Sequence, residues 1–183
     1  MRLFTAIDLP EDVRDRLAAL IGRLRPSARL KWSAAGNLHI TTKFIGEWPA
    51  ERLEELATAL RGVPGRAPVA VAIRGLGWFP NPRAPRVFWA GVEAGSLLEE
   101  LARDTDLALT RLGVAREDRP FSPHLTLARI KEPAPLDRLR DAVSSLPSVE
   151  FGQFTVDRFC LYESQLRPSG SVYSKLQEFV FTK

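Results

Sequence analysis

The sequence predicts an α+β fold of two pseudo-symmetric lobes, each a mainly antiparallel sheet with helices on its outer face, and with a cleft between the lobes. Short strand-like runs rich in β-branched residues alternate with stretches in which apolar residues recur at helical spacing. The order strand, helix, strand, helix also occurs twice, since Phe4 precedes His39 by 35 residues and Phe88 precedes His124 by 36. The length fits one bilobed domain over residues 1–183, with approximate halves 1–85 and 86–183.

The first half begins with a predicted strand at residues 2–7. Asp8, Pro10 and Glu11 mark the start of a helix whose apolar stripe continues to Leu24, and Pro26 ends it. Five further elements are expected in order: an extended piece at 30–32, a small-residue turn at 33–37, a strand at 38–45, a helix from about residue 49, and a strand from 69 toward 79.

The second half repeats this plan. Residues 86–90 resemble residues 2–6, which places Phe88 at the position of Phe4. A helix is expected from Ser96, with Glu99 completing a capping box. The remaining expected elements are a strand around 123–129, an amphipathic helix around 136–146, and strand-like runs at 151–162 and 171–181 separated by a turn at 167–170. Periodicity alone does not assign the last two runs to a lobe.

Composition narrows the functional classes. No stretch approaches the roughly 20 apolar residues of a membrane span, and the first residues do not resemble a signal peptide, so we expect a cytoplasmic protein without membrane contact. The single cysteine, Cys160, excludes an internal disulfide and a multi-cysteine metal site. The net charge is +4 and 21 of the 26 basic residues are arginine, which permits a nucleic-acid or nucleotide ligand without requiring one.

The chain has two histidines, and each precedes a threonine by two residues: His39 precedes Thr41, and His124 precedes Thr126. Nine of the 183 residues are threonine, so chance would produce both pairs about once in four hundred cases. Residues i and i+2 of a strand face the same side, so an imidazole and a hydroxyl stand together twice. One such motif is equally typical of an ordinary core or surface histidine, whereas the repetition favours a shared functional site.

Two such pairs suit phosphate chemistry if the motif strands face one another. Histidines can serve as base and acid at neutral pH, because an ordinary pKa of about 6.5 allows one neutral and one protonated ring. The hydroxyls of Thr41 and Thr126 would bind the non-bridging oxygens of a phosphate, while one histidine deprotonates the attacking oxygen and the other protonates the leaving oxygen. A catalytic zinc site would lack its third histidine or cysteine ligand, and no nucleophile-elbow pattern indicates a Ser-His-Asp triad.

The motifs and their flanks resemble the two-histidine (2H) phosphoesterases, in particular the RNA 2′,3′-cyclic phosphodiesterases, also called 2′-5′ RNA ligase-like proteins. The flanks are residues 4–10, 77–80, 86–91 and 121–129, and the similarity runs from about residue 2 to residue 180. The resemblance implies a bilobed fold with a metal-free, cofactor-free active cleft that hydrolyses 2′,3′-cyclic phosphate RNA ends to 2′-phosphates. It also implies that His39 is the proton donor to the leaving 3′ oxygen and His124 the proton acceptor that activates water.

Two positions need comment against the family pattern, Thr42 for its residue type and Arg129 for its position in the strand. Thr42 stands where the family usually has leucine, and by strand parity it faces the lobe interior, so we expect an effect on packing of about 1 kcal/mol and none on chemistry. Arg129 resembles the family arginine that contacts phosphate. It lies five residues after His124, which is the wrong parity for a straight strand, so a bulge or the strand end must redirect it, or it is only a solvated arginine.

Aromatic residues near the motifs offer a second kind of substrate contact. Phe121 is expected to contact substrate, and Trp32, Trp78 and Phe79 are further candidates to stack on a base, because aromatic platforms serve single-stranded RNA. Core packing is the alternative for all four side chains.

Other functions stay open at this level. A 2′-5′ RNA ligase and a 2′-5′ oligonucleotide phosphodiesterase are the enzymatic alternatives, and a non-catalytic RNA-end binding module is the alternative from another class. Two intact motifs favour catalysis. The expected partner is an RNA with a 2′,3′-cyclic phosphate terminus or a related nucleotide, and the protein is expected to be a monomer.

Overall fold

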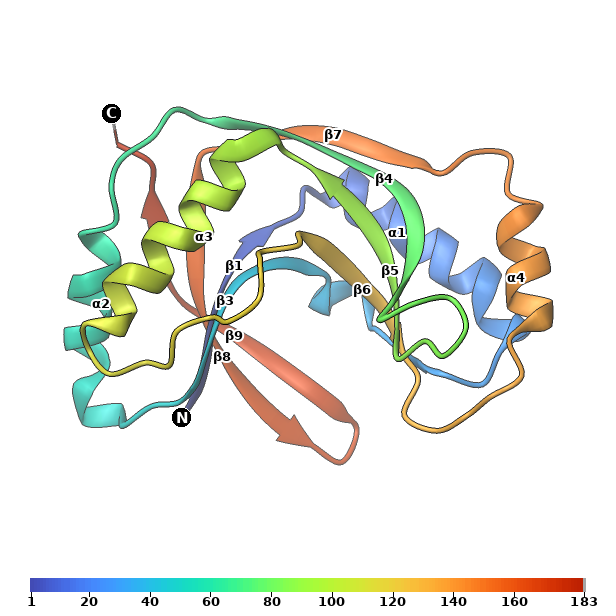
Figure 1. Cartoon of the computed structure of the whole chain (residues 1–183), viewed down its shortest axis with the longest axis horizontal. Helices are drawn as coiled ribbons and strands as arrows, with labels where there is room; N and C mark the ends of the chain where they lie inside the picture. Colours follow the sequence, from blue (N-terminus) through green and yellow to red (C-terminus); the bar gives the residue numbers. More distant parts are fainter. Residues whose placement is uncertain (183) are drawn as a thin grey trace.

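The computed structural model describes residues 1–182 and confirms the α+β prediction, with two antiparallel sheets that form an arched ribbon (Figure 1). The first sheet has the strand order β3-β1-β8-β9 and the second the order β2-β6-β5-β4-β7. The first contains β1 (Arg2–Asp8), β3 (His39–Glu47), β8 (Arg158–Arg167) and β9 (Gly170–Val180). The second contains β2 (Lys31–Trp32), β4 (Val69–Phe79), β5 (Val87–Glu93), β6 (His124–Arg129) and β7 (Glu150–Val156).

Four α-helices cover the sheets within residues 1–182: α1 (Glu11–Leu24), α2 (Leu53–Arg61), α3 (Gly95–Thr110) and α4 (Asp137–Ser144). Short 3-10 turns are η1 (Arg25–Ser27), η2 (Ala35–Asn37) and η3 (Ala50–Arg52). The predicted stripe of α1 is buried from Val13 to Leu24, because residues at this spacing share one helix face. No helix in the described part of the chain is long and apolar enough to cross a membrane.

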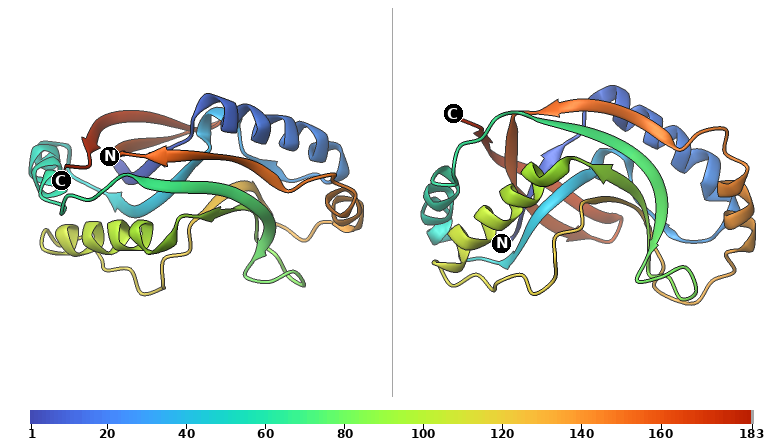
Figure 2. Two further views of the ribbon diagram at one scale, coloured as in Figure 1. Left: turned by 90° about the horizontal axis from the view of Figure 1, so that it is seen from above. Right: turned by 45° about the horizontal axis from the view of Figure 1, so that its top comes forward.

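Helices α1 and α3, which follow strands β1 and β5, each pack against the other sheet and not against the sheet of the preceding strand. Helix α1 follows β1 of the first sheet but packs on β7 of the second, where a Cβ at Gly152 would lie 2.9 Å from Val13. Helix α3 follows β5 of the second sheet but contacts β3 and α2. The first lobe therefore comprises the first sheet with α2 and α3, and the second lobe the second sheet with α1 and α4. Figure 2 shows α1 and α3 on opposite sides of the β4 and β7 ribbons.

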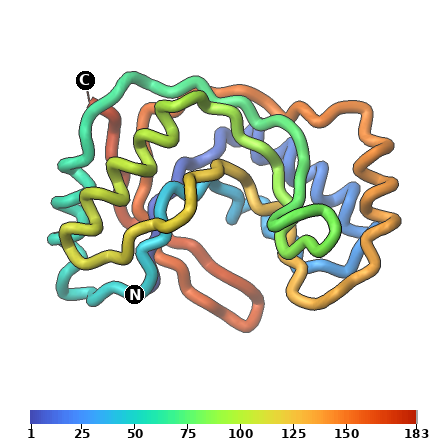
Figure 3. Tube along the Cα trace, in the orientation of Figure 1, coloured from blue at the N-terminus to red at the C-terminus, as the bar shows by residue number. Residues whose placement is uncertain are grey.

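The last strand-like runs are divided between the lobes. The run at 151–162 breaks after Val156, so β7 joins the second sheet and β8 joins the first. Strands β8 and β9 form a long hairpin that projects from the rest of the protein (Figure 3). Each sheet therefore draws strands from both halves of the chain, and the hairpin brings C-terminal side chains to the first lobe.

Two local predictions were wrong. Helix α3 begins at Gly95 after Ala94 and has no side-chain cap, so Ser96 and Glu99 form no capping box. The correspondence of Phe4 with Phe88 is also shifted by one residue. Asp8 is the register partner of His39 in one sheet, and Gly91 that of His124 in the other, so counting back from these pairs makes Thr5 the counterpart of Phe88.

A buried ion pair anchors β3 to α3. Lys43 Nζ lies 2.7 Å from Asp106 Oδ1 and donates a 2.7 Å hydrogen bond to the carbonyl oxygen of Ala115. Lys43 is only 3% exposed and Asp106 8% exposed. Lys43 Nζ also lies 3.6 Å from Glu117 Oε2, and Asp106 Oδ2 lies 3.9 Å from Arg116 Nε, so loss of one member would leave the other with a longer and more exposed ion pair. The pair therefore holds the motif strand against its supporting helix.

Candidate active site

The two motif strands have the same local construction. In β3, register partners change from Thr41 opposite Ala6 to Lys43 opposite Thr5, which leaves Thr42 as a bulge residue. In β6, the partners change from Thr126 opposite Trp89 to Ala128 opposite Phe88, which leaves Leu127 in the same position. Each bulge comes three residues after its histidine. Strands β3 and β6 also contact one another, although they belong to different sheets, so the fold brings the two motifs together.

His39 lies within a cluster of aromatic rings from three strands. It stacks on Phe4 of β1 with 4.8 Å between ring centroids and meets the edge of Tyr173 of β9 at 5.1 Å. Tyr162 of β8 is 6.1 Å away in a stacked orientation. These rings remove water from the imidazole, because they cover it with apolar surface. Sequence reasoning missed all three contacts, since the pairing of β1 with β3 and the sheet that holds β8 and β9 depend on distant parts of the chain.

This burial lowers the pKa of His39 to about 4, because desolvation disfavours the charged imidazolium. A hydrogen bond with the backbone of Asn37 and the negative charge of Asp8 act in the opposite direction but do not outweigh burial. His39 is therefore neutral at pH 7 in the ligand-free protein. An anion placed beside the ring would favour its protonated form.

Asp8 belongs to a polar network behind the aromatic cluster. Its carboxylate accepts a hydrogen bond from Tyr162 Oη and lies 2.6 Å from Lys175 Nζ. Burial opposes ionisation, but the hydrogen bonds from Lys175 and Tyr162 keep the pKa of Asp8 below its ordinary value. Asp8 is therefore ionised at neutral pH. The network ties β9 to β1 and so supports the strand next to His39.

His124 has more open surroundings. Its Nδ1 lies 2.8 Å from the carbonyl oxygen of Ser122, and the ring meets Phe79 edge-on at 5.0 Å. Because a carbonyl only accepts, Nδ1 must carry the donated hydrogen. In the neutral ring this leaves the lone pair on Nε2 free to accept a proton. The orienting bond to a residue two positions upstream parallels the bond between His39 and Asn37.

The threonines of the motifs behave as strand geometry predicts. Thr41 and Thr126 are half-buried and, as i+2 residues before the bulges, lie on the faces that carry His39 and His124. Thr42 is buried, as expected, and its hydroxyl is 2.7 Å from the hydroxyl of Thr5. The interior hydroxyl that departs from the family pattern is thus hydrogen-bonded.

The bulges decide which residue follows each motif on the same face. Arg129 pairs with Val87 beyond the bulge at Leu127, so it returns to the face of His124 and is exposed. The redirection required for a functional Arg129 is therefore present. Phe44 holds the equivalent position in β3, where it is 60% exposed. The two motifs thus end in different chemistry, a cation in one and an aromatic ring in the other.

The aromatic candidates have different surroundings. Phe121, Trp32 and Trp78 are partly buried and pack against the core. Trp78 lies 4.5 Å from Phe88, and Arg140 lies over its ring. Phe79 packs on Trp89 at 5.0 Å as well as on His124. Phe79 is therefore the one of the four with a ring contact to a motif histidine among the described residues.

Comparison with known sequences gives consistent matches over most of the chain. A family model described as LigT-like phosphoesterase matches residues 7–89 and 92–173. An RNA 2′,3′-cyclic phosphodiesterase of Thermus thermophilus is 39% identical, covering 98% of this chain and 89% of its own length. A protein of the same name from Methanothermobacter thermautotrophicus is 35% identical, covering 98% of both chains.

Solved structures show the same fold. The crystal structure of a protein from Thermus thermophilus superposes with a TM-score of 0.82 at 38% identity, covering 99% of this chain and 98% of that one. Escherichia coli LigT in its apo form has a TM-score of 0.80 at 27% identity, covering 100% and 98%. LigT has also been crystallised with 3′-AMP and with phosphate. With the family model matching most of its length, this chain belongs to the LigT-like phosphoesterases of the two-histidine superfamily.

Proposed function

We propose that this protein hydrolyses RNA 2′,3′-cyclic phosphate ends to 2′-phosphates with His39 and His124 as an acid-base pair and without a metal ion. The observation that carries the proposal is the contact between two strands with the same His-x-Thr sequence and the same bulge. Several relatives at 34–39% identity are named RNA 2′,3′-cyclic phosphodiesterases, which supports the reaction class and the RNA substrate.

In the proposed reaction a water oxygen attacks phosphorus while the bond from phosphorus to the 3′ oxygen breaks. His124 takes the proton of the water and His39 gives a proton to the 3′ oxygen, which leaves a 3′-hydroxyl and a 2′-phosphate. Thr41, Thr126 and Arg129 bind the non-bridging oxygens, because hydroxyls and a guanidinium donate hydrogen bonds to a phosphate anion. Phe121 contributes a contact to the bound nucleotide.

The hydrogen bond of His124 supports its assignment as proton acceptor. With Nδ1 donating to Ser122, neutral His124 presents an unprotonated Nε2 to the attacking water. To act as the proton donor, His39 must be protonated when substrate is bound, although its pKa of about 4 keeps it neutral in the free protein. The phosphate monoanion must raise this pKa when substrate binds, because an adjacent opposite charge favours the imidazolium.

Metal independence is supported by the donor set around the histidines. Among residues 1–182, neither histidine belongs to a cluster of three or more side chains able to share a metal ion. The one cluster of this kind joins Asp8, Cys160 and Glu178, and the ammonium group of Lys175 lies within 2.8 Å of carboxylate oxygens of both acids. Burial raises the pKa of the Cys160 thiol to about 12, which disfavours the thiolate form that binds metals.

The test is hydrolysis of a dinucleotide ending in a 2′,3′-cyclic phosphate, in excess EDTA, followed by phosphorus NMR. We expect turnover and a 2′-phosphate product. The control is the His39→Ala, His124→Ala double variant purified in parallel, which excludes a contaminating ribonuclease. Binding without turnover would indicate an RNA-end binding module, loss of activity in EDTA would indicate a metalloenzyme, and a 3′-phosphate product would contradict the assigned leaving oxygen.

A further inference from the structure

A surface depression of about 620 Å³ lies on the second lobe, apart from the two histidines. We call it the η1–β2 groove. It is lined by Arg25, Ala28, Arg29, Leu30, Lys31 and Trp32, which belong to η1, to strand β2 and to the segment between them. Arg25, Arg29 and Lys31 are exposed, and among residues 1–182 none of them has a carboxylate partner within 4.0 Å. Their positive charge is therefore available to a ligand.

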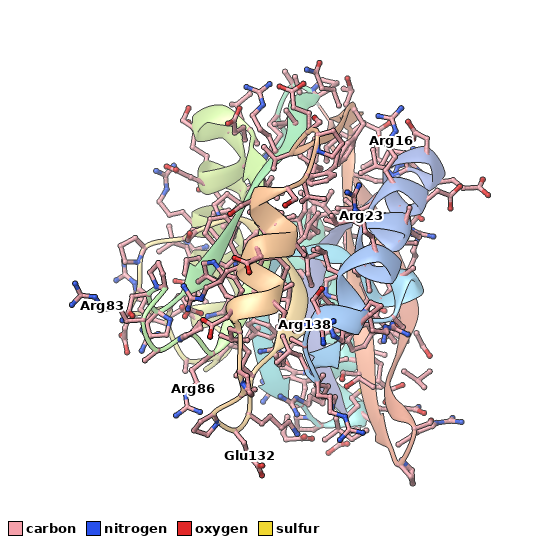
Figure 4. All side chains as sticks on the ribbon, turned by 90° about the vertical axis from the view of Figure 1, so that its right-hand side faces the viewer. Arg16, Arg23, Arg83, Arg86, Glu132 and Arg138 are labelled. Atoms are coloured by element: carbon pink, nitrogen blue, oxygen red, sulfur yellow. The ribbon has the colours of Figure 1, made fainter. Side chains whose placement is uncertain are left out.

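The groove is in the most basic part of the chain. Residues 16–46 contain six arginine and lysine residues and no acidic residue, so nothing in this segment cancels the field of the groove. Figure 4 shows Arg16 and Arg23 on α1, Arg138 on α4, and Arg83 and Arg86 near β5, all on the same lobe. A cationic lobe of this kind attracts polyanions by a long-range field.

The groove is connected to the candidate active site through the β6 strand. Lys31 pairs with Arg129 and Trp32 with Ala128, so β2 lies beside the end of the second motif strand. Four to five residues separate this pairing from His124, which corresponds to about 13–17 Å of extended strand. Arg129, the register partner of Lys31, faces the same side as His124. Positively charged side chains therefore extend from Arg129 at the end of the motif strand to Lys31 in the groove.

The lining combines charge with one indole ring. Trp32 is half-buried, its Nε1 donates a 3.1 Å hydrogen bond to the carbonyl of Ala28, and its ring meets Phe88 edge-on at 6.1 Å. The ring is thus held in one orientation by the core while it lines the groove. A cationic groove with a fixed aromatic side chain is the arrangement that binds single-stranded nucleic acid through phosphates and stacked bases.

We propose that the η1–β2 groove binds the phosphodiester backbone of the single-stranded RNA that leads to the cyclic phosphate end. This inference rests on the function proposed above and makes the substrate an oligonucleotide rather than a cyclic mononucleotide. Arg25, Arg29 and Lys31 bind phosphates two or more nucleotides upstream of the reacting phosphorus. Trp32 provides a stacking surface for a base.

The test compares kcat/KM for a single-stranded hexanucleotide ending in a 2′,3′-cyclic phosphate with kcat/KM for a 2′,3′-cyclic mononucleotide. The groove variant is Arg25→Gln, Arg29→Gln, Lys31→Gln. The matched control is Arg2→Gln, Arg103→Gln, Arg111→Gln, which removes the same charge from exposed positions of the first lobe. We expect the groove variant to lose about 10- to 100-fold on the hexanucleotide and less than about 2-fold on the mononucleotide, and the control to keep both rates.

Salt dependence gives a second readout. If three phosphate contacts are lost, the slope of log(kcat/KM) against log salt concentration for the hexanucleotide should become shallower by about 2, since each single-strand contact contributes roughly 0.7. Equal losses on both substrates, or a hexanucleotide rate unchanged by the groove substitutions, would overturn the inference. A wild-type protein that hydrolyses neither substrate would instead contradict the proposed function.

Discussion

The motif strands β3 and β6 share a sequence and a bulge but differ in what surrounds their histidines. His39 is covered by rings from β1, β8 and β9 and has a pKa of about 4, whereas His124 is oriented by the carbonyl of Ser122 and touches Phe79. The residue opposite each histidine also differs, since it is Asp8 in one sheet and Gly91 in the other. The duplicated strand supplies the same positions twice, and neighbouring strands give the two positions different chemistry.

Removing either histidine should have the largest effect. We expect His39→Ala and His124→Ala each to lower kcat by about 10² to 10⁴, the usual contribution of a positioned acid or base. Steady-state rates on a cyclic-phosphate dinucleotide measure this loss. Near-normal turnover in one variant would remove that histidine from the mechanism.

A nitrophenyl phosphodiester separates the two roles, because nitrophenolate leaves without protonation. It should restore much of the activity of His39→Ala and little of that of His124→Ala. The reverse pattern would exchange the donor and acceptor, and the low pKa of His39 in the free protein makes this exchange the main alternative. Equal rescue of both variants would contradict the assignment of one histidine as acid and the other as base.

The burial of His39 should make the free energy of unfolding depend on pH. Because the pKa of His39 is lower in the folded protein than its ordinary value of 6.5, the unfolded chain takes up this proton first as the pH falls. The free energy of unfolding should therefore decrease between about pH 6.5 and pH 4, by about 3 kcal/mol from His39. Urea unfolding at pH 7 and pH 4 should show a smaller decrease in His39→Gln than in wild type. Identical pH profiles for the two proteins would contradict the burial of His39.

The residues after the bulges provide a third comparison. Arg129→Ala should lower kcat/KM by about 10- to 100-fold, since a hydrogen bond to a charged group contributes about 1.5–3 kcal/mol. Phe44→Ala, at the equivalent position of β3, should change it by less than about 3-fold. If both substitutions had the same effect, Arg129 would be only a solvated side chain.

Thr41→Val and Thr126→Val test whether the two motif hydroxyls contribute alike. Each substitution should lower kcat/KM through a loss of about 1–3 kcal/mol of transition-state stabilisation, because valine keeps the shape but donates no hydrogen bond to phosphate. The thermal unfolding midpoint should stay nearly constant. Wild-type kinetics in the valine variants would show that the threonines only favour strand formation.

The smallest effect concerns the interior of the first lobe. Thr42→Val leaves the buried Thr5 hydroxyl without its partner and should cost about 1 kcal/mol of unfolding free energy with unchanged kcat. The double variant Thr5→Val, Thr42→Val should recover part of this loss, because no unpaired hydroxyl then stays buried. A large change in kcat would mean that Thr42 reaches the site after all.

Much of the local structure was predictable because it depends on nearby residues. The apolar stripe from Val13 to Leu24 indicated α1 and its buried face, and two-residue alternation placed Thr42 in the interior and Thr41 beside His39. The pair of His-x-Thr motifs also predicted a two-histidine site. These features follow from helix and strand periods, which are written in consecutive residues.

The tertiary structure alone decided what surrounds the motifs. Strand pairing brought Tyr162 and Tyr173 to His39, and it set Asp8 opposite His39 but Gly91 opposite His124. It also shifted the match between the halves by one residue. The bulge at Leu127 turned Arg129 back to the face of His124. Register and sheet membership depend on contacts between residues far apart in the chain, so periodicity could not determine them. The sequence by itself determined that two imidazoles would be presented alike, and the packing of distant strands decided that they would differ.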